Sequence, residues 1–87
     1  MKNITNRQSL FLNGAEVARI YREEGKPVYL ASMGGCGMCQ VTALAMKREL
    51  MSMSYVFITT WNTELTQKYI EFVKAFDTMY RMSREVK

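Results

Sequence analysis

The stretch KPVYLASMGGCGMC, residues 26–39, decides the predicted fold. Proline lacks the N–H donor that interior strand residues need, so it suits the first position of a strand. Pro27 therefore introduces a short predicted strand over residues 28–31. The residues that follow, 32–37, are rich in glycine and exclude regular structure. The stretch thus predicts a strand that leads into an irregular loop.

The loop delivers two cysteines in a Cys-x-x-Cys spacing, and residues 40–50 after them are rich in helix formers. We expect Cys36 to be exposed, with its thiolate stabilised by the positive end of that helix, and Gly37 to leave its sulfur accessible. Cys39, one turn into the helix, is expected to be more buried. The pair predicts thiol–disulfide exchange, in which Cys36 attacks a disulfide and Cys39 resolves the mixed disulfide.

The segments around this motif predict alternating helices and strands. Residues 9–12 are a short apolar run that ends at the Asn13-Gly14 turn signal and predicts either a brief strand or a helix entry. Residues 15–24 predict a helix that Asn13 caps and Gly25 ends. Residues 55–60 are β-branched and aromatic without alternation, which is typical of a strand buried in a parallel sheet.

A last helix, capped by Asn62 or Thr63, is predicted from an amphipathic stripe. The stripe consists of Leu65, Tyr69, Phe72, Val73, Phe76, Met79 and Tyr80. This helix is longer than a sheet of two or three strands can cover. We therefore expect its outer turns to pack against a second molecule, as a homodimer or a complex with a protein partner.

Two parts of the chain resemble the thioredoxin family. Residues 26–31 followed by 36–39 resemble that family's strand, active-site loop and helix, and residues 55–60 followed by 62–69 are similar to its next strand and helix start. The resemblance covers roughly residues 15–70. It implies an α/β fold with a small thioredoxin-like core of two or three strands, at least one parallel pair, and three helices. It also implies Cys36 as nucleophile and Cys39 as resolving cysteine.

The sequence departs from the thioredoxin pattern at several elements, and one of them is functional. The family places a cis-proline opposite its cysteines, whereas the only proline here is Pro27. This departure favours weak catalysis or pure binding. The leading prediction is therefore a small thiol–disulfide oxidoreductase. The alternative is a non-catalytic interaction or inhibitor protein on a thioredoxin-like scaffold. Small chains of the second kind are typical of phage proteins that act on a host protein.

Other residues near the cysteines are candidates for substrate binding. Met33 and Met38 flank Cys36 and can form a soft apolar collar for a partner peptide, with Gly35 and Gly37 leaving room for it. Trp61 follows the second predicted strand, so its ring is expected near the carboxyl ends of the sheet, where ligands bind. The alternative for Trp61 is a partly buried cap on the last helix.

The cysteines have other interpretations. They can pack as inert small apolar residues, or two copies of the chain can share a four-cysteine zinc site. Residues 33–37 can also bind an anion through backbone N–H groups, although the GK[ST] end of a phosphate-binding loop is missing. We expect no resident cofactor and no metal. Met46 and Met79 are expected to be core residues.

Composition bounds these expectations. The chain has 87 residues, 48% of them apolar, which predicts one domain over residues 1–87. It contains no histidine, so histidine-based catalysis is excluded. The net charge of +4 comes from basic residues that do not cluster, so no nucleic-acid partner is expected. No apolar stretch approaches the about 20 residues of a membrane span, and the polar residues 1–13 lack a signal region, which predicts a cytoplasmic protein with no membrane partner.

Overall fold

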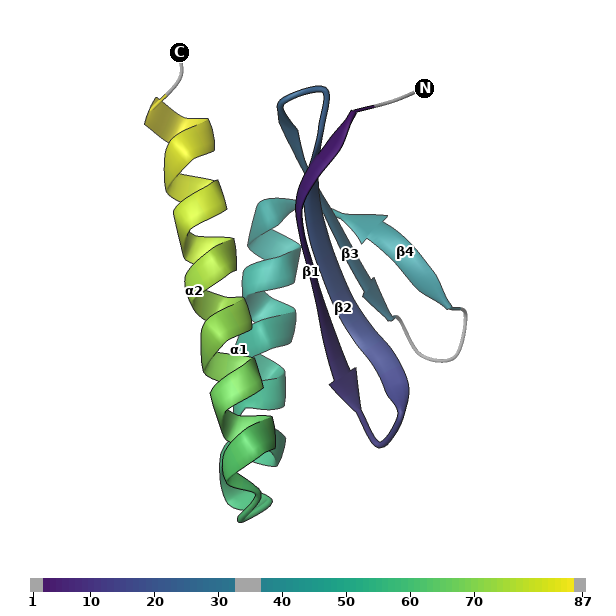
Figure 1. Cartoon of the computed structure of the whole chain (residues 1–87), viewed down its shortest axis with the longest axis vertical. Coiled ribbons are helices and arrows are strands. Elements are labelled where there is room, and N and C mark those ends of the chain that lie inside the picture. Colours follow the sequence, from purple (N-terminus) through teal and green to yellow (C-terminus); the bar gives the residue numbers. More distant parts are fainter. Residues whose placement is uncertain (1–2, 33–36, 86–87) are drawn as a thin grey trace.

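The computed structural model describes residues 3–32 and 37–85, and it consists of an antiparallel sheet followed by two helices (Figure 1). The sheet is a meander of four strands in the order β1-β2-β3-β4, with every neighbouring pair antiparallel. The strands are β1 (Ile4–Leu12), β2 (Ala15–Glu23), β3 (Lys26–Ser32) and β4 (Met38–Val41), and the helices are α1 (Ala43–Thr59) and α2 (Thr63–Glu85). Both helices lie side by side against one face of the sheet.

The predicted thioredoxin-like α/β fold is wrong. Such a core needs at least one parallel pair of strands and three helices, whereas the described strands pair only antiparallel and precede both helices. Residues 15–24, predicted as a helix, form β2 instead. Residues 55–60, predicted as a strand, belong to the end of α1 and its C-cap.

Two tight turns explain why residues 15–24 form a strand. Asn13 and Gly14 have φ values of 53° and 80°, and Glu24 and Gly25 have φ values of 52° and 79°. Positive φ at both central residues marks the two-residue turns whose twist matches antiparallel strands. Asn13-Gly14 is therefore a hairpin turn rather than a helix cap, and Gly25 closes the next hairpin rather than ending a helix.

The second half of α1 is helical, and of its large apolar side chains only Phe57 is fully buried, while Met53 is partly buried against the core. Phe57 is fully buried, whereas Tyr55, Val56 and Ile58 are exposed. A strand buried on both faces would cover all four. Thr42 caps the N-terminus of α1, because its hydroxyl oxygen accepts a hydrogen bond from the backbone N–H of Ala45 at 3.1 Å.

The core lies between the sheet and the two helices, and it confirms the predicted stripe of α2. Tyr69, Phe72, Phe76 and Met79 are buried there. The ring of Phe76 packs edge-on against Tyr29 of β3, with ring centroids 5.4 Å apart. The outer turns of α2 are therefore covered within the chain itself. Our expectation that they pack against a second molecule is wrong. A sheet of four strands covers more of the helix than the predicted two or three.

Three local predictions are confirmed. Residues 28–31 lie within β3. Asn62 caps α2, since its side-chain oxygen accepts a hydrogen bond from the backbone N–H of Leu65 at 3.2 Å. Met46 and Met79 are buried core residues, with 0% and 4% of their surface exposed.

The contrast between Phe57 and Val56 tests the helical assignment. Phe57→Ala should lower the free energy of unfolding by about 3–5 kcal/mol, as is usual for a fully buried phenylalanine. Val56→Ala, the matched control at a position with 41% exposure, should change it by less than about 0.5 kcal/mol. Urea unfolding followed by circular dichroism measures both. Equal losses for the two variants would indicate a strand buried on both faces.

Candidate functional site

Cys39, the described cysteine of the motif, does not lie where the sequence predicted it. Cys39 lies in β4 and is exposed, not buried one turn into a helix. The helix expected from residue 40 begins only at Ala43, so Cys39 does not lie at its N-terminus. Cys36, together with Met33 and Gly35, lies outside the described residues. The predicted helical placement of Cys39 is therefore wrong, while the role of Cys36 and thiol exchange itself stay predictions.

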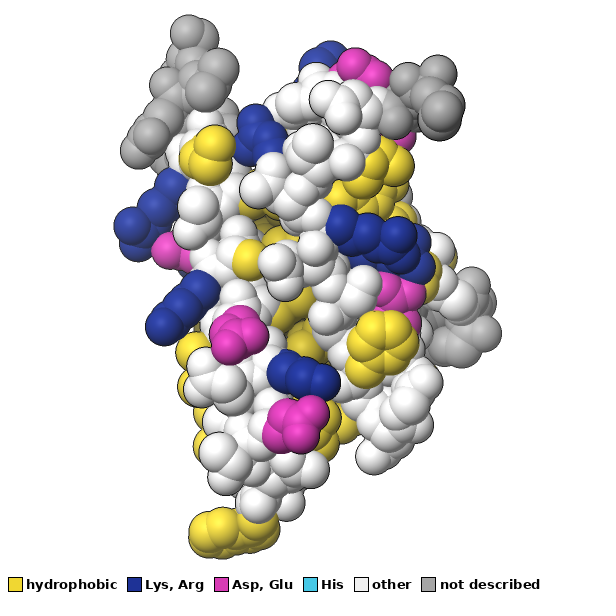
Figure 2. Space-filling view, in the orientation of Figure 1, with side chains coloured by type: hydrophobic (Ala, Val, Ile, Leu, Met, Phe, Trp, Pro, Cys, Tyr) yellow, Lys and Arg dark blue, Asp and Glu magenta, His cyan; other side chains and the backbone are white. Residues whose placement is uncertain are grey.

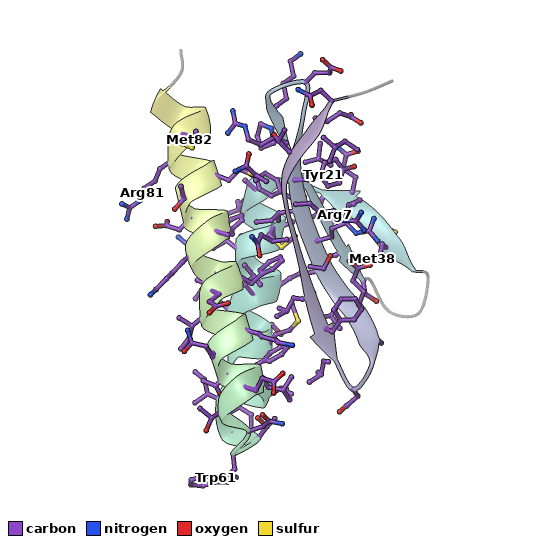
Figure 3. All side chains as sticks on the ribbon, in the orientation of Figure 1. Arg7, Tyr21, Met38, Trp61, Arg81 and Met82 are labelled. Carbon is purple, nitrogen blue, oxygen red and sulfur yellow. The ribbon has the colours of Figure 1, made fainter. Side chains whose placement is uncertain are left out.

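The predicted binding residues that the structure describes, Gly37, Met38 and Trp61, do not form one site. Met38, partly buried, points away from the helices on the open side of the sheet, whereas Trp61 lies at the far tip of the helical hairpin (Figure 3). Gly37 has a φ of 78° and precedes β4. Trp61 is 96% exposed, so it is neither near the carboxyl ends of a parallel sheet nor a partly buried cap.

Residues 3–32 and 37–85 contain no group of three or more Cys, Asp or Glu side chains placed to hold a metal ion. Within the same ranges, neither helix is long and apolar enough to cross a membrane. Charged side chains of both signs are interspersed on the face that α2 and β1 present (Figure 2). On this face the basic residues form no continuous stripe.

The most unusual surface of the described chain is the outer side of α1. Leu44, Met51, Tyr55 and Ile58 are 61%, 66%, 75% and 60% exposed. Their spacing of seven, four and three residues places them within about 60° of one another around the helix axis. Trp61, which is 96% exposed, lies just beyond the C-terminal end of the helix. We call these five residues the outer row.

The outer row exists because α1 is apolar on two sides. Its inner side, formed by Met46, Leu50 and Phe57, packs into the core. The outer row lies about 130° around the axis from these residues. A helix that is hydrophobic on both sides is normally covered on both. In the structure, only the inner side of α1 is covered.

The outer row is also large. Since fully exposed large side chains offer about 150–250 Å² each, it presents on the order of 700 Å². The largest apolar patch of a typical monomer is about 300–600 Å². Residues 51–61 contain no charged side chain, whereas Lys47 and Arg48 are basic. The row is therefore a neutral apolar surface with positive charge near its N-terminal end.

An apolar groove between α1 and α2 adjoins the row, with a volume of about 160 Å³. Its walls include Lys47, Met51 and Val73, and its floor includes Leu50 and Tyr69. The Tyr69 hydroxyl donates a hydrogen bond to the backbone carbonyl oxygen of Leu50 at 2.5 Å. Burial raises the pKa of Tyr69, so its hydroxyl keeps its proton. This bond ties the two helices together under the groove.

Trp61 is held in a backbone conformation that does not favour stability. Its φ is 61°, in the left-handed region that bulky residues rarely adopt and that costs about 1–2 kcal/mol. Its side chain is almost fully exposed and so contributes little to the core. A tryptophan is the residue type most enriched at binding hot spots. Its position therefore suits contact with another molecule rather than folding.

The open face of the sheet is a second, more polar surface. Arg7, Tyr21 and Met38 lie on this side in Figure 3. Arg19 donates two hydrogen bonds to the carboxylate of Glu16, from Nε at 2.9 Å and from Nη2 at 2.5 Å. The Arg19 guanidinium is the main reason that the pKa of Glu16 falls from 4.5 to about 2. This face carries a fixed ion pair, unlike the outer row.

Comparison with known proteins gives no relative. No protein-family model, no curated protein sequence and no solved structure matches the chain. The outer row and the open face of the sheet are therefore the features that bear on function.

The Glu16–Arg19 pair predicts a pH dependence. The pKa of Glu16 is about 2 in the folded chain and 4.5 for a free carboxyl group. The pair therefore stabilises the fold fully above pH 4.5, and this contribution is lost as the pH falls toward 2. Glu16→Gln should lower the free energy of unfolding by about 1 kcal/mol at pH 7 and by much less at pH 3.

Urea unfolding at pH 7, 4 and 3 measures this dependence. Glu64→Gln is the matched control, because Glu64 pairs with Lys68 on an exposed part of α2. Its effect should stay within a few tenths of a kcal/mol at every pH. If the loss caused by Glu16→Gln were the same at pH 7 and pH 3, the pair would not be the cause.

Proposed function

We propose that the protein is a non-catalytic interaction protein that pairs with a second copy of itself through the outer row. The observation that carries this proposal is the exposure of four large apolar side chains in one line along α1, with the exposed Trp61 just beyond its C-terminal end. It keeps the interaction function expected from the sequence but not the thioredoxin-like scaffold. In the proposed dimer, the helices of two copies form a central layer and the two sheets face outward.

The arrangement of the row suits an antiparallel pair of α1 helices. The segment from Leu44 to Ile58 is about 21 Å long. When two copies cross at Met51, Leu44 of each lies opposite Ile58 of the other, since both are seven residues from the centre. The two ends of the row then cover each other. Identical surfaces that match in this way give a closed dimer.

The charges also favour the antiparallel pair. Lys47 and Tyr55 are each four residues from Met51, so the ammonium group of one copy meets the aromatic ring of the other. Such a contact contributes about 0.5–1 kcal/mol at exposed sites. A parallel pair would instead place Lys47 against Lys47 and Arg48 against Arg48. Like charges at these positions disfavour the parallel arrangement.

The size of the surface is sufficient for a stable pair. A standard interface buries about 800 Å² on each partner. The outer row supplies most of this area, and the rims of the adjoining groove supply the rest. Trp61 and Tyr55, both aromatic, are the expected energetic anchors.

Met51→Glu tests the pairing, because it places two carboxylates against each other at the centre of the proposed dimer. Wild type should be a dimer at tens of micromolar concentration, and Met51→Glu should be a monomer in sedimentation equilibrium. Its circular dichroism spectrum and melting temperature should stay close to those of the dissociated wild type, because Met51 is 66% exposed.

Met82→Glu is the matched control. Met82 is an exposed methionine of α2 outside the outer row, and the variant should remain a dimer. A wild-type chain that is monomeric at tens of micromolar concentration would contradict the proposal. If both variants dissociated equally, the dimer interface would not lie on α1.

Thiol–disulfide exchange is a second candidate, supported by the exposure of the Cys39 thiol. In this reaction a substrate disulfide is reduced to two thiols while Cys36 and Cys39 are oxidised to a disulfide. Intact mass after alkylation, with and without dithiothreitol, tests it. A reversible Cys36–Cys39 disulfide would support this candidate, and two thiols that stay free under mild oxidation would exclude it. Dimerisation through α1 does not depend on either result.

A further inference from the structure

A pocket of about 240 Å³ lies between the sheet and the C-terminal half of α2. The molecular surface is notched in this region, between the upper part of α2 and the strands (Figure 2). Polar side chains from both layers line the pocket: Asn6, Gln8, Arg22, Lys74 and Thr78. It is separate from the outer row and shares no residue with it.

Arg22 gives the pocket a fixed positive charge. Its Nη2 atom donates a hydrogen bond to the backbone carbonyl oxygen of Gly25 at 2.6 Å, which anchors the guanidinium group to the β2–β3 turn. Its Nη1 atom is buried and has no hydrogen-bond partner among the described residues. A buried donor of a charged group without a partner is costly. A water molecule or an anion in contact with Nη1 would satisfy this donor.

An irregularity in β1 brings further donors to the same place. Thr5 pairs with Arg22 and Gln8 pairs with Ile20, so two residues of β1 oppose one residue of β2 between them. Asn6, within this bulge, has a φ of 56°. Bulges of this kind redirect side chains and are common beside binding sites. Asn6, within this bulge, and Gln8, at its end, both line the pocket.

We propose that this pocket binds a small phosphate monoester. The two charged residues that line it, Arg22 and Lys74, are both basic, and no lining residue is acidic. Two cations balance the double negative charge of a phosphate monoester. Donors are also available from Asn6, Gln8 and Thr78, which together exceed what the two oxygens of a carboxylate accept. A phosphate group offers three terminal oxygens to the same set.

The rest of the pocket suits a short organic group. Ala75, Met79 and Met82 of α2 form its apolar side. Sites for drug-sized ligands measure about 300–1,000 Å³. A pocket of about 240 Å³ is smaller and therefore fits a phosphate with only a few carbon atoms attached. Methionine side chains adapt to such groups without a fixed shape.

Titration of the full-length protein with glycerol phosphate, followed by two-dimensional NMR of the backbone amides, tests the proposal. Saturable shifts should map to Asn6, Gln8, Arg22, Lys74 and Thr78. Lys74→Gln should weaken binding at least about tenfold, as expected for the loss of one charged hydrogen bond. Lys74 is exposed, so the variant should fold normally. Lys68→Gln, an equal change of charge two turns away, should bind like wild type.

Two further probes separate phosphate recognition from weaker explanations. Butyrate, which carries a carboxylate, should bind at least about tenfold more weakly than glycerol phosphate because it leaves donors unused. Sodium chloride at matched ionic strength should cause no saturable shift. The proposal is overturned if glycerol phosphate gives no saturation, if butyrate binds as tightly, or if Lys68→Gln weakens binding as much as Lys74→Gln. Met51→Glu should bind normally, which separates this test from that of dimerisation.

Discussion

The burial of Phe57 fixes the orientation of α1, and the proposed dimer surface depends on that orientation. Phe57 has no exposed surface and stacks on Tyr69 of α2 with ring centroids 5.0 Å apart. Its backbone carbonyl oxygen also accepts hydrogen bonds from the hydroxyl groups of Thr60, at 3.0 Å, and Thr66, at 2.9 Å. Because each residue turns a helix by about 100°, holding Phe57 inside places Tyr55 and Ile58 outside.

The parts of the fold that could be predicted are those with a single strong local signal. The stripe of α2 repeats over more than four turns, and it identifies both the helix and its buried side. Pro27 marks the start of β3, and Asn62 marks the start of α2. In each case the local preference and the tertiary structure agree.

Two segments were wrongly predicted because a local signal had two meanings. The apolar side chains in the segment 15–24 fit a helical period. However, tight turns at both ends make this segment the second strand of a meander. The β-branched and aromatic residues 55–60 favour a strand, but α1 continues through most of them to bury Phe57. The resemblance to thioredoxin depended on the second of these segments, on the cysteine motif and on the strand before that motif.

The candidate surface was predictable in part. Residues 51–61 lack any charge, but residues 55–60 among them were predicted to form a buried strand. In the structure most of these residues belong to α1, where Phe57 lies on the buried inner side and Met51, Tyr55 and Ile58 lie in the outer row. The pocket beside Arg22 gave no sequence signal, because Asn6, Arg22 and Lys74 are far apart in the chain and meet only when α2 packs on β1 and β2.

Disulfide cross-linking at Met51 tests the central claim most directly. In a background where both native cysteines are replaced by serine, Met51→Cys places one thiol of each copy at the proposed twofold axis. The account predicts rapid formation of a disulfide-linked dimer under mild oxidation, with Met82→Cys cross-linking slowly or not at all. A Met51→Cys variant that stays monomeric, or that cross-links no faster than Met82→Cys, would contradict pairing through the outer row.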